Sequence, residues 1–196
     1  MDGAPGPTRL TRDRVIADCY RRAMTRSLLA DAFDHHVWAT QQLMDTCAGL
    51  TSDQLASTVP GTYGTILDTL RHIVGADCNY LAVLTDGAIE RIDEGSMDLA
   101  EVRSTFDRVS EAWPGLLARD LDPDQVYVRY RDDGSEAHAP LGIRLAQVLV
   151  HGTDHRSQIA TALTQLGVTP PEMDVWDYAL SQGRFVEVPA PATAGS

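Results

Sequence analysis

The chain has 196 residues, a length that fits one domain with a sizeable core. Hydrophobic residues make up 43% and charged residues 22%, which is the composition of a folded globular protein and excludes a disordered or fibrous one. The net charge of −12 repels phosphate backbones, and no arginine cluster forms a compensating basic stripe, so nucleic acid is excluded from the expected partners.

The chain carries no signal for a membrane or for an oxidising compartment. No apolar stretch approaches the roughly 18–20 residues that span a bilayer, and the N-terminus lacks the layout of a secretory signal. Cys19, Cys47 and Cys78 are odd in number and lack C-x-x-C spacing, which predicts buried thiols and argues against a disulfide framework or a thiolate zinc site. We therefore expect a cytoplasmic protein with no membrane partner.

The first long helical segment follows a short tail. Residues 1–10 combine Gly, Pro and Thr and are predicted to be disordered, whereas residues 11–48 contain neither Gly nor Pro and predict one long helix or two in series. Residues expected to point toward the core recur along this segment at steps of three and four positions, so they define one face of a helix. That face comprises Leu29, Phe33, His36, Thr40, Leu43, Met44 and Cys47.

The second helix is predicted to start after Thr65 and to run to about Leu84. The preceding segment, TSDQLASTVPGTYGT, is rich in turn formers and predicts a connection, and Thr65 with Asp68 three residues later resembles a capping box. His72 lies on a face with small and polar residues, opposite the larger apolar stripe of this helix. Periodicity alone therefore leaves two alternatives for His72, a solvent-exposed side chain or one against a closely approaching helix.

The second half of the chain predicts one further helix, a hairpin and the clearest helix of all. Residues 97–119 show helical periodicity, with Pro114 expected to kink or end the helix. Residues 122–140 combine a β-prone stretch with an Asp-Gly turn and predict a short hairpin. A helix from Leu141 to the stop at Gly167 follows, then a short helix over 173–180.

These elements predict an all-α fold, a four-helix bundle with a small β-hairpin before the last long helix. We expect a single domain over residues 11–182 and a flexible C-terminal tail over 183–196.

The last helix carries the strongest chemical signal. His151 and His155 are four residues apart, on or beside the apolar stripe, so one metal ion can be reached by both imidazoles. The alternative is a pair of ordinary core or surface histidines, and a third ligand is needed, for which His72 is the candidate. Gly152 between them indicates close backbone approach or room for a ligand, the alternative being a tolerated glycine.

Two polar residues of the first helix point toward the core. His36 is either a satisfied core histidine or a proton acceptor beside the metal, and Thr40 could donate a hydrogen bond to substrate. His35 and His138 are expected to have structural or solvated roles, because the first points away from the inward face and the second sits in the hairpin.

Three strings, FDHHVWATQQL, GTYGTILDTLRHIVGADCNYL and VLVHGTDHRSQIATALTQLGV, together resemble the DinB/YfiT-like family of metalloenzymes over roughly residues 25–168. The resemblance implies a four-helix bundle in which His72, His151 and His155 bind a divalent ion. The chain departs from the family's frequent Y-N-x-W-A-N string, because His35, His36 and Thr40 replace its Tyr and two Asn.

Relatives in this superfamily include thiol-dependent transferases and isomerases, which use bacillithiol, mycothiol or glutathione. The resemblance therefore implies a metal-dependent transferase of a small-molecule substrate, in which zinc or nickel activates a low-molecular-weight thiol. All sixteen basic residues are Arg, as in GC-rich actinobacterial-type genomes, which favours mycothiol as the cosubstrate. His36 is then expected to assist proton transfer and Thr40 to line the substrate pocket.

Two other functions fit the same ligands, a hydrolase that uses metal-bound water and a non-catalytic, metal-stabilised binding or stress-response module. Helical bundles commonly pair, so a homodimer is also expected.

Overall fold

The computed structural model describes residue 27 and residues 29–186. Residues Ser27–Glu172 form one compact unit, and the described residues from Met173 onward belong to a second unit. The predicted tail 1–10, the predicted helix before residue 27, Cys19, and the predicted C-terminal tail beyond residue 186 lie outside the described residues.

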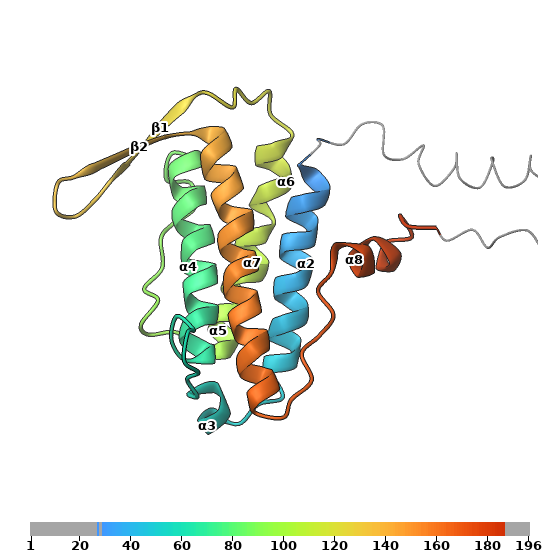
Figure 1. Ribbon diagram of the computed structural model, residues 1–196. Helices are drawn as coiled ribbons and strands as arrows, with labels where there is room; N and C mark the ends of the chain where they lie inside the picture. The colour runs from blue at the N-terminus through green and yellow to red at the C-terminus, as the bar shows by residue number, and fades with distance from the viewer. Residues whose placement is uncertain (1–26, 28, 187–196) are drawn as a thin grey trace, which may run out of the picture. The chain divides into compact units, whose positions relative to one another are not determined.

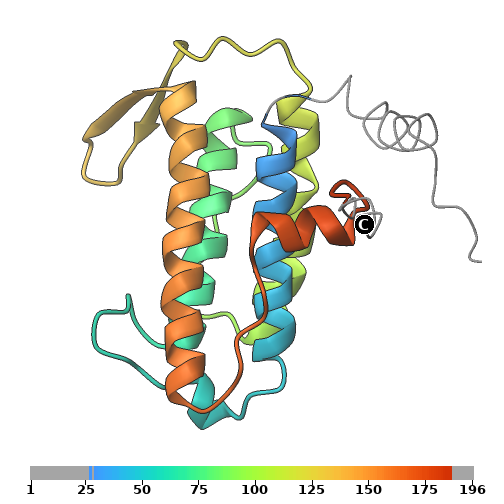
Figure 2. The ribbon, with the colours of Figure 1, turned by 45° about the vertical axis from the view of Figure 1, so that its right-hand side comes forward.

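Long helices build the first unit. They are α2 (Ala30–Cys47), α4 (Ile66–Leu84), α5 (Leu99–Ser110) continued by α6 (Ala112–Leu117), and α7 (Leu141–Gln165). In Figures 1 and 2 they run side by side, with α7 packed against both α4 and α2, and α5 against the other side of the same two helices. The predicted four-helix bundle is confirmed.

The connection between α4 and α5 runs lengthwise along the bundle. In Figure 1, α4 and the α5–α6 segment both run upward, whereas α2 and α7 run downward. Because α4 and α5 are parallel, residues 85–98 return along the outside of the bundle from the end of α4 to the level of its start. This return places loop side chains beside the middle of α4.

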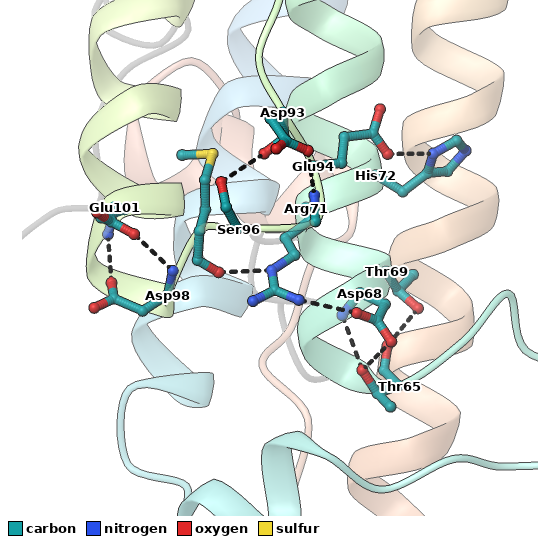
Figure 3. A network of polar contacts seen from close by, with 12 residues as sticks. Thr65, Asp68, Thr69, Arg71, His72, Asp93, Glu94, Ser96, Asp98 and Glu101 are labelled. Carbon is teal, nitrogen blue, oxygen red and sulfur yellow. Dashed lines mark hydrogen bonds and ion pairs between the residues drawn. The ribbon is translucent and has the colours of Figure 1, made fainter.

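Side-chain caps set where the helices begin. The Thr65 hydroxyl oxygen accepts the backbone N–H of Asp68 at 3.0 Å, and the same hydroxyl donates to the Asp68 carboxylate at 2.7 Å (Figure 3). The predicted start of α4 is confirmed, although Asp68 bonds the Thr65 side chain and not its backbone. Asp98 and Glu101 form a complete capping box at the start of α5.

One predicted interruption is confirmed and one element differs from the prediction. The interruption expected from Pro114 is present, because the helix predicted over 97–119 is divided at Glu111 into α5 and α6, and Pro114 has no N–H to donate to the Ser110 carbonyl four residues earlier. The predicted connection contains a one-turn helix, α3 (Ser52–Leu55), which begins with a capping box between Thr51 and Gln54. This helix was not predicted, because it is only four residues long and lies in a segment rich in turn-forming residues.

Large apolar side chains fill the bundle core. The ring of Phe33 on α2 lies 4.7 Å, centroid to centroid, from the ring of Trp113 on α6, and both are 1% exposed. Further fully buried side chains come from every long helix, including Leu43, Leu70, Ile73, Phe106, Leu141 and Ile159. Burial of these side chains is the main source of stability of the unit.

The predicted hairpin is present at one end of the bundle. Strands β1 (Val126–Tyr130) and β2 (Glu136–Pro140) pair antiparallel, and Gly134 adopts a φ of +81° in the turn. The buried Arg144 guanidinium of α7 donates to the carbonyls of Tyr127 and Ala137, one on each strand. The hairpin is therefore tied to the start of α7.

Helix α7 ends where the sequence predicts, because Gly167 follows its last turn with a φ of +74° and the Val168 N–H bonds back to Leu163. In the second unit, α8 (Val175–Ser181) matches the predicted short helix and is capped by Asp174. None of the helices in the described part of the chain is long and apolar enough to cross a membrane.

Candidate metal centre

Three imidazoles from two helices meet at one place. His72 extends from α4, and His151 and His155 extend from successive turns of α7. One ring nitrogen from each residue lies within 4.8 Å of the other two, and the Nε2 atoms of His72 and His151 are 3.1 Å apart. The convergence that the sequence predicted for these side chains is present in the structure.

The donor set fits a divalent transition-metal ion. Zinc binds histidine nitrogens at about 2.0–2.1 Å, so the nitrogens of a tetrahedral site lie about 3.4 Å apart. The 3.1 Å separation of the His72 and His151 nitrogens is close to that value. Imidazole ligands suit zinc, nickel, cobalt and iron, and three of them leave one position of a tetrahedral ion for an exogenous ligand.

The site lies at the boundary between the core and the solvent. His155 is 8% exposed, whereas His72 and His151 are partly exposed. This agrees with the sequence, in which His155 falls inside the apolar stripe of α7 and His151 on its rim. Solvent therefore reaches parts of His72 and His151, whereas His155 is closed off by the bundle.

Gln158 determines which nitrogen of His155 carries the proton. Its side-chain oxygen accepts the backbone N–H of Tyr63 at 2.9 Å, and its side-chain nitrogen donates to Asp154 at 3.2 Å. The oxygen, 3.2 Å from His155 Nδ1, can only accept, so Nδ1 carries the hydrogen. Nε2 of His155 is thereby left as a ligand nitrogen.

Tyr63 forms one wall of the site. Its ring stacks on the His72 ring with 4.0 Å between the centroids and an interplanar angle of 9°, and it forms a T-shaped pair with the His155 ring at a centroid distance of 5.4 Å. The side chain is still 54% exposed. Tyr63 sits in the segment between α3 and α4, and periodicity gave no reason to single it out.

His36 lies in a buried polar network that joins three helices. It donates from Nε2 to the Asp77 carboxylate on α4 at 3.0 Å and accepts at Nδ1 from the Arg156 guanidinium on α7 at 3.0 Å. Arg156 also donates to Thr40 at 3.1 Å. Burial lowers the pKa of Arg156 to about 10, and the charge of Asp77 acts in the opposite direction.

The structure thus places His36 and Thr40 in the interior, where they are 1% and 0% exposed. The inward orientation predicted for both is confirmed. Proton transfer by His36 and substrate binding by Thr40 stay predictions. Asp77 and Arg156 were missed as partners, although an acidic residue within the apolar run IVGADC is a signal that could have pointed to a buried network.

Gly152 is required by the close approach of His36. A Cβ atom at this position would lie 2.4 Å from Cε1 and 2.6 Å from Nδ1 of His36. The sequence left close backbone approach, room for a ligand and a tolerated glycine as alternatives, and the structure shows close approach by the neighbouring helix.

His138 and the two described cysteines are not part of the three-histidine cluster. His138 is exposed on β2 and 2.7 Å from Glu136. Cys47 and Cys78 are buried, which raises the pKa of their thiols to about 12 and about 11. Both are therefore inert thiols at neutral pH, as the sequence predicted.

His151 makes the stability of the metal-free protein depend on pH. Burial, together with the neighbouring His155 and His72, lowers its pKa from the ordinary 6.5 to about 4. The unfolded chain therefore takes up a proton near pH 6.5 that the folded chain accepts only near pH 4, and stability falls as the pH drops between these values. In urea unfolding with chelator present, His151→Gln is expected to lose less stability over this range than the wild type. Identical pH dependence in the two proteins would contradict this assignment.

Comparisons with known proteins agree with the fold. The model of the DinB family matches residues 24–189. A DinB-like protein from Bacillus cereus ATCC 10987 is 19% identical, with a TM-score of 0.58 over 75% of this chain and 97% of that chain. YfiT from Bacillus subtilis is 15% identical, with a TM-score of 0.53 over 86% of this chain and 95% of that chain. YfiT is described as a probable metal-dependent hydrolase with an unusual four-helix bundle topology. No curated protein matches the sequence.

Proposed function

The chain belongs to the DinB family, and from this premise we propose that His72, His151 and His155 hold a divalent metal ion that activates a nucleophile. The observation that carries the proposal is the approach of three ring nitrogens, from two helices, to within 4.8 Å of one another. Such an ion supplies Lewis acidity, which favours the anionic form of a thiol or of water near neutral pH.

The nucleophile we propose is the sulfur of a low-molecular-weight thiol of the mycothiol type. In this transfer the thiol loses its proton, a sulfur–carbon bond forms with an electrophilic substrate, and the leaving group departs with its electron pair. The partly exposed His72 and His151 leave one side of the site accessible to such molecules. Tyr63 offers an aromatic face beside that opening.

Hydrolysis is the second candidate, because the structural neighbour YfiT is described as a probable metal-dependent hydrolase. Water would then replace the thiol as nucleophile, with the same three ligands. Analysis of the products formed with and without thiol separates the two reactions.

His36 and Thr40 support the site from the interior in this proposal. Both contact Arg156, which follows the ligand His155 directly in α7. The proton-transfer role predicted for His36 has weaker support, since its ring nitrogens are engaged by Asp77 and Arg156.

The test of the proposal combines elemental analysis with turnover. The purified protein is expected to bind one zinc or nickel ion per chain, and the ion is expected to raise the melting temperature, because it binds the folded state preferentially. The loaded protein is then incubated with a panel of thiols and electrophiles, with chelated protein as the control. Absence of bound ion would overturn the metal proposal, and an ion without any conjugate or hydrolysis product would favour a non-catalytic module.

A further inference from the structure

A carboxylate from the long return connection contacts one of the three histidines. Glu94 lies in residues 85–98, which pass along α4, and its Oε2 atom is 3.1 Å from Nδ1 of His72. Figure 3 shows the two side chains pointing toward each other, with His72 extending from α4. The His72 ring therefore contacts Glu94 through Nδ1 on one side and faces His151 through Nε2 on the other.

Gly75 provides the space for this carboxylate. It lies one turn after His72 on α4, and a Cβ atom there would be 2.2 Å from Oε1, 2.4 Å from Cδ and 2.6 Å from Cγ of Glu94. A glycine in a helix interior costs about 1 kcal/mol relative to alanine. The three nearest atoms all belong to Glu94, so the small residue at this position is explained by the carboxylate that lies over it.

The contact determines the tautomer of His72. An ionised carboxylate only accepts hydrogen bonds, so Nδ1 of His72 carries the hydrogen and donates it to Glu94. The lone pair of Nε2 then points toward His151 Nε2, 3.1 Å away. A histidine that donates its other ring N–H to a carboxylate is a more basic and better oriented metal ligand.

We propose that Glu94 is a positioning residue for the metal ion, acting through His72, and that Gly75 leaves the space that its side chain occupies. This inference rests on the proposed function, because it assigns Glu94 to the same three-histidine site. His155 has a neutral amide partner in Gln158, whereas His72 has an anionic one, so the ligand from α4 is the stronger donor of the two.

The test measures metal affinity of the full chain by competition with a chromophoric chelator, using zinc alone as the probe. Glu94→Ala is expected to weaken zinc binding about 10–100-fold, the usual effect of losing such a partner. Glu94→Gln, which keeps an acceptor but loses the charge, is expected to weaken it less. Gly75→Ala is expected to resemble Glu94→Ala, and the double variant is expected to be no weaker than either single variant.

Glu90→Gln is the matched control, because Glu90 lies in the same connection and is exposed. It is expected to bind zinc like the wild type. A second readout is the ring tautomer of His72 in the zinc-free protein, measured by ¹⁵N NMR of the imidazole. The Nδ1–H form is expected to dominate in the wild type and in Glu90→Gln, and to lose its dominance in Glu94→Ala.

The outcomes separate this inference from the proposed function. A wild type that does not bind zinc would refute the metal proposal itself. If the wild type binds zinc and Glu94→Ala binds it as tightly as Glu90→Gln does, the metal proposal stands and the role of Glu94 is refuted. A loss of affinity with an unchanged His72 tautomer would also refute positioning through His72.

Discussion

Replacing His155 with alanine is expected to weaken divalent-metal binding about 100- to 1,000-fold. Four-ligand zinc sites gain about 10–16 kcal/mol in total, or roughly 2.5–4 kcal/mol for each ligand, and the loss of one ligand therefore corresponds to about this decrease in affinity. His155 is the most buried of the three rings and its tautomer is held by Gln158, so its nitrogen needs little reorganisation on binding. Chelator competition on the purified variant measures the change.

The control for this prediction is His138→Ala, since His138 is an exposed histidine on the hairpin. It is expected to leave metal affinity unchanged. Far-UV circular dichroism and thermal melting of metal-free samples establish that His155→Ala still folds. A folded variant that keeps wild-type affinity would show that His155 is not a ligand.

Replacing Asp77 with asparagine is expected to lower the free energy of unfolding by about 3 kcal/mol. The substitution preserves shape but removes the negative charge that faces His36 and opposes the effect of burial on Arg156. Asp77 is 2% exposed and Arg156 is 3% exposed, so water cannot replace the lost charge. Removing one member of a buried charge pair typically costs about 3–5 kcal/mol. Urea unfolding at pH 7 measures the difference.

Coupling with Arg156 distinguishes this explanation from a general packing defect. The double variant Asp77→Asn with Arg156→Met is expected to be less destabilised than the sum of the two single variants, by about 1 kcal/mol or more. Asp107→Asn is the matched control, because Asp107 is partly exposed and pairs with Arg103 at the surface of the bundle, where an ion pair is worth at most about 1 kcal/mol. Additive single effects would refute the coupled network.

The site was predictable from the sequence where the ligands share a helix. His151 and His155 are four residues apart, and helical geometry alone places both on one face of α7. His72 was different, because the local pattern of α4 allowed an exposed side chain, and the family resemblance pointed to it. The order of the long helices was likewise readable from Gly, Pro and capping residues.

The remaining parts of the site depend on contacts that local pattern does not encode. Glu94 and Tyr63 come from connections, and their positions depend on the path of each connection across the bundle. Asp77 and His36 are 41 positions apart in the sequence, and their hydrogen bond depends on how α2 and α4 pack. Gly75 and Gly152 were visible as glycines within helices, but only the folded structure shows which side chain each one admits.

The helices that carry the three histidines, α4 and α7, also carry Asp77 and Arg156 and pack directly against each other. The spacing of the three imidazoles is therefore set by the packing of a hydrophobic core, so we expect the chain to fold with or without an ion, unlike small zinc domains, which fold only when loaded. The free energy of metal binding then does not have to offset the entropy cost of folding the chain, so it contributes fully to the affinity for the ion. For the proposed site we therefore expect one ion to exchange for another on the folded protein, so that the bound metal depends on the supply of each metal as well as on its intrinsic preference for imidazole.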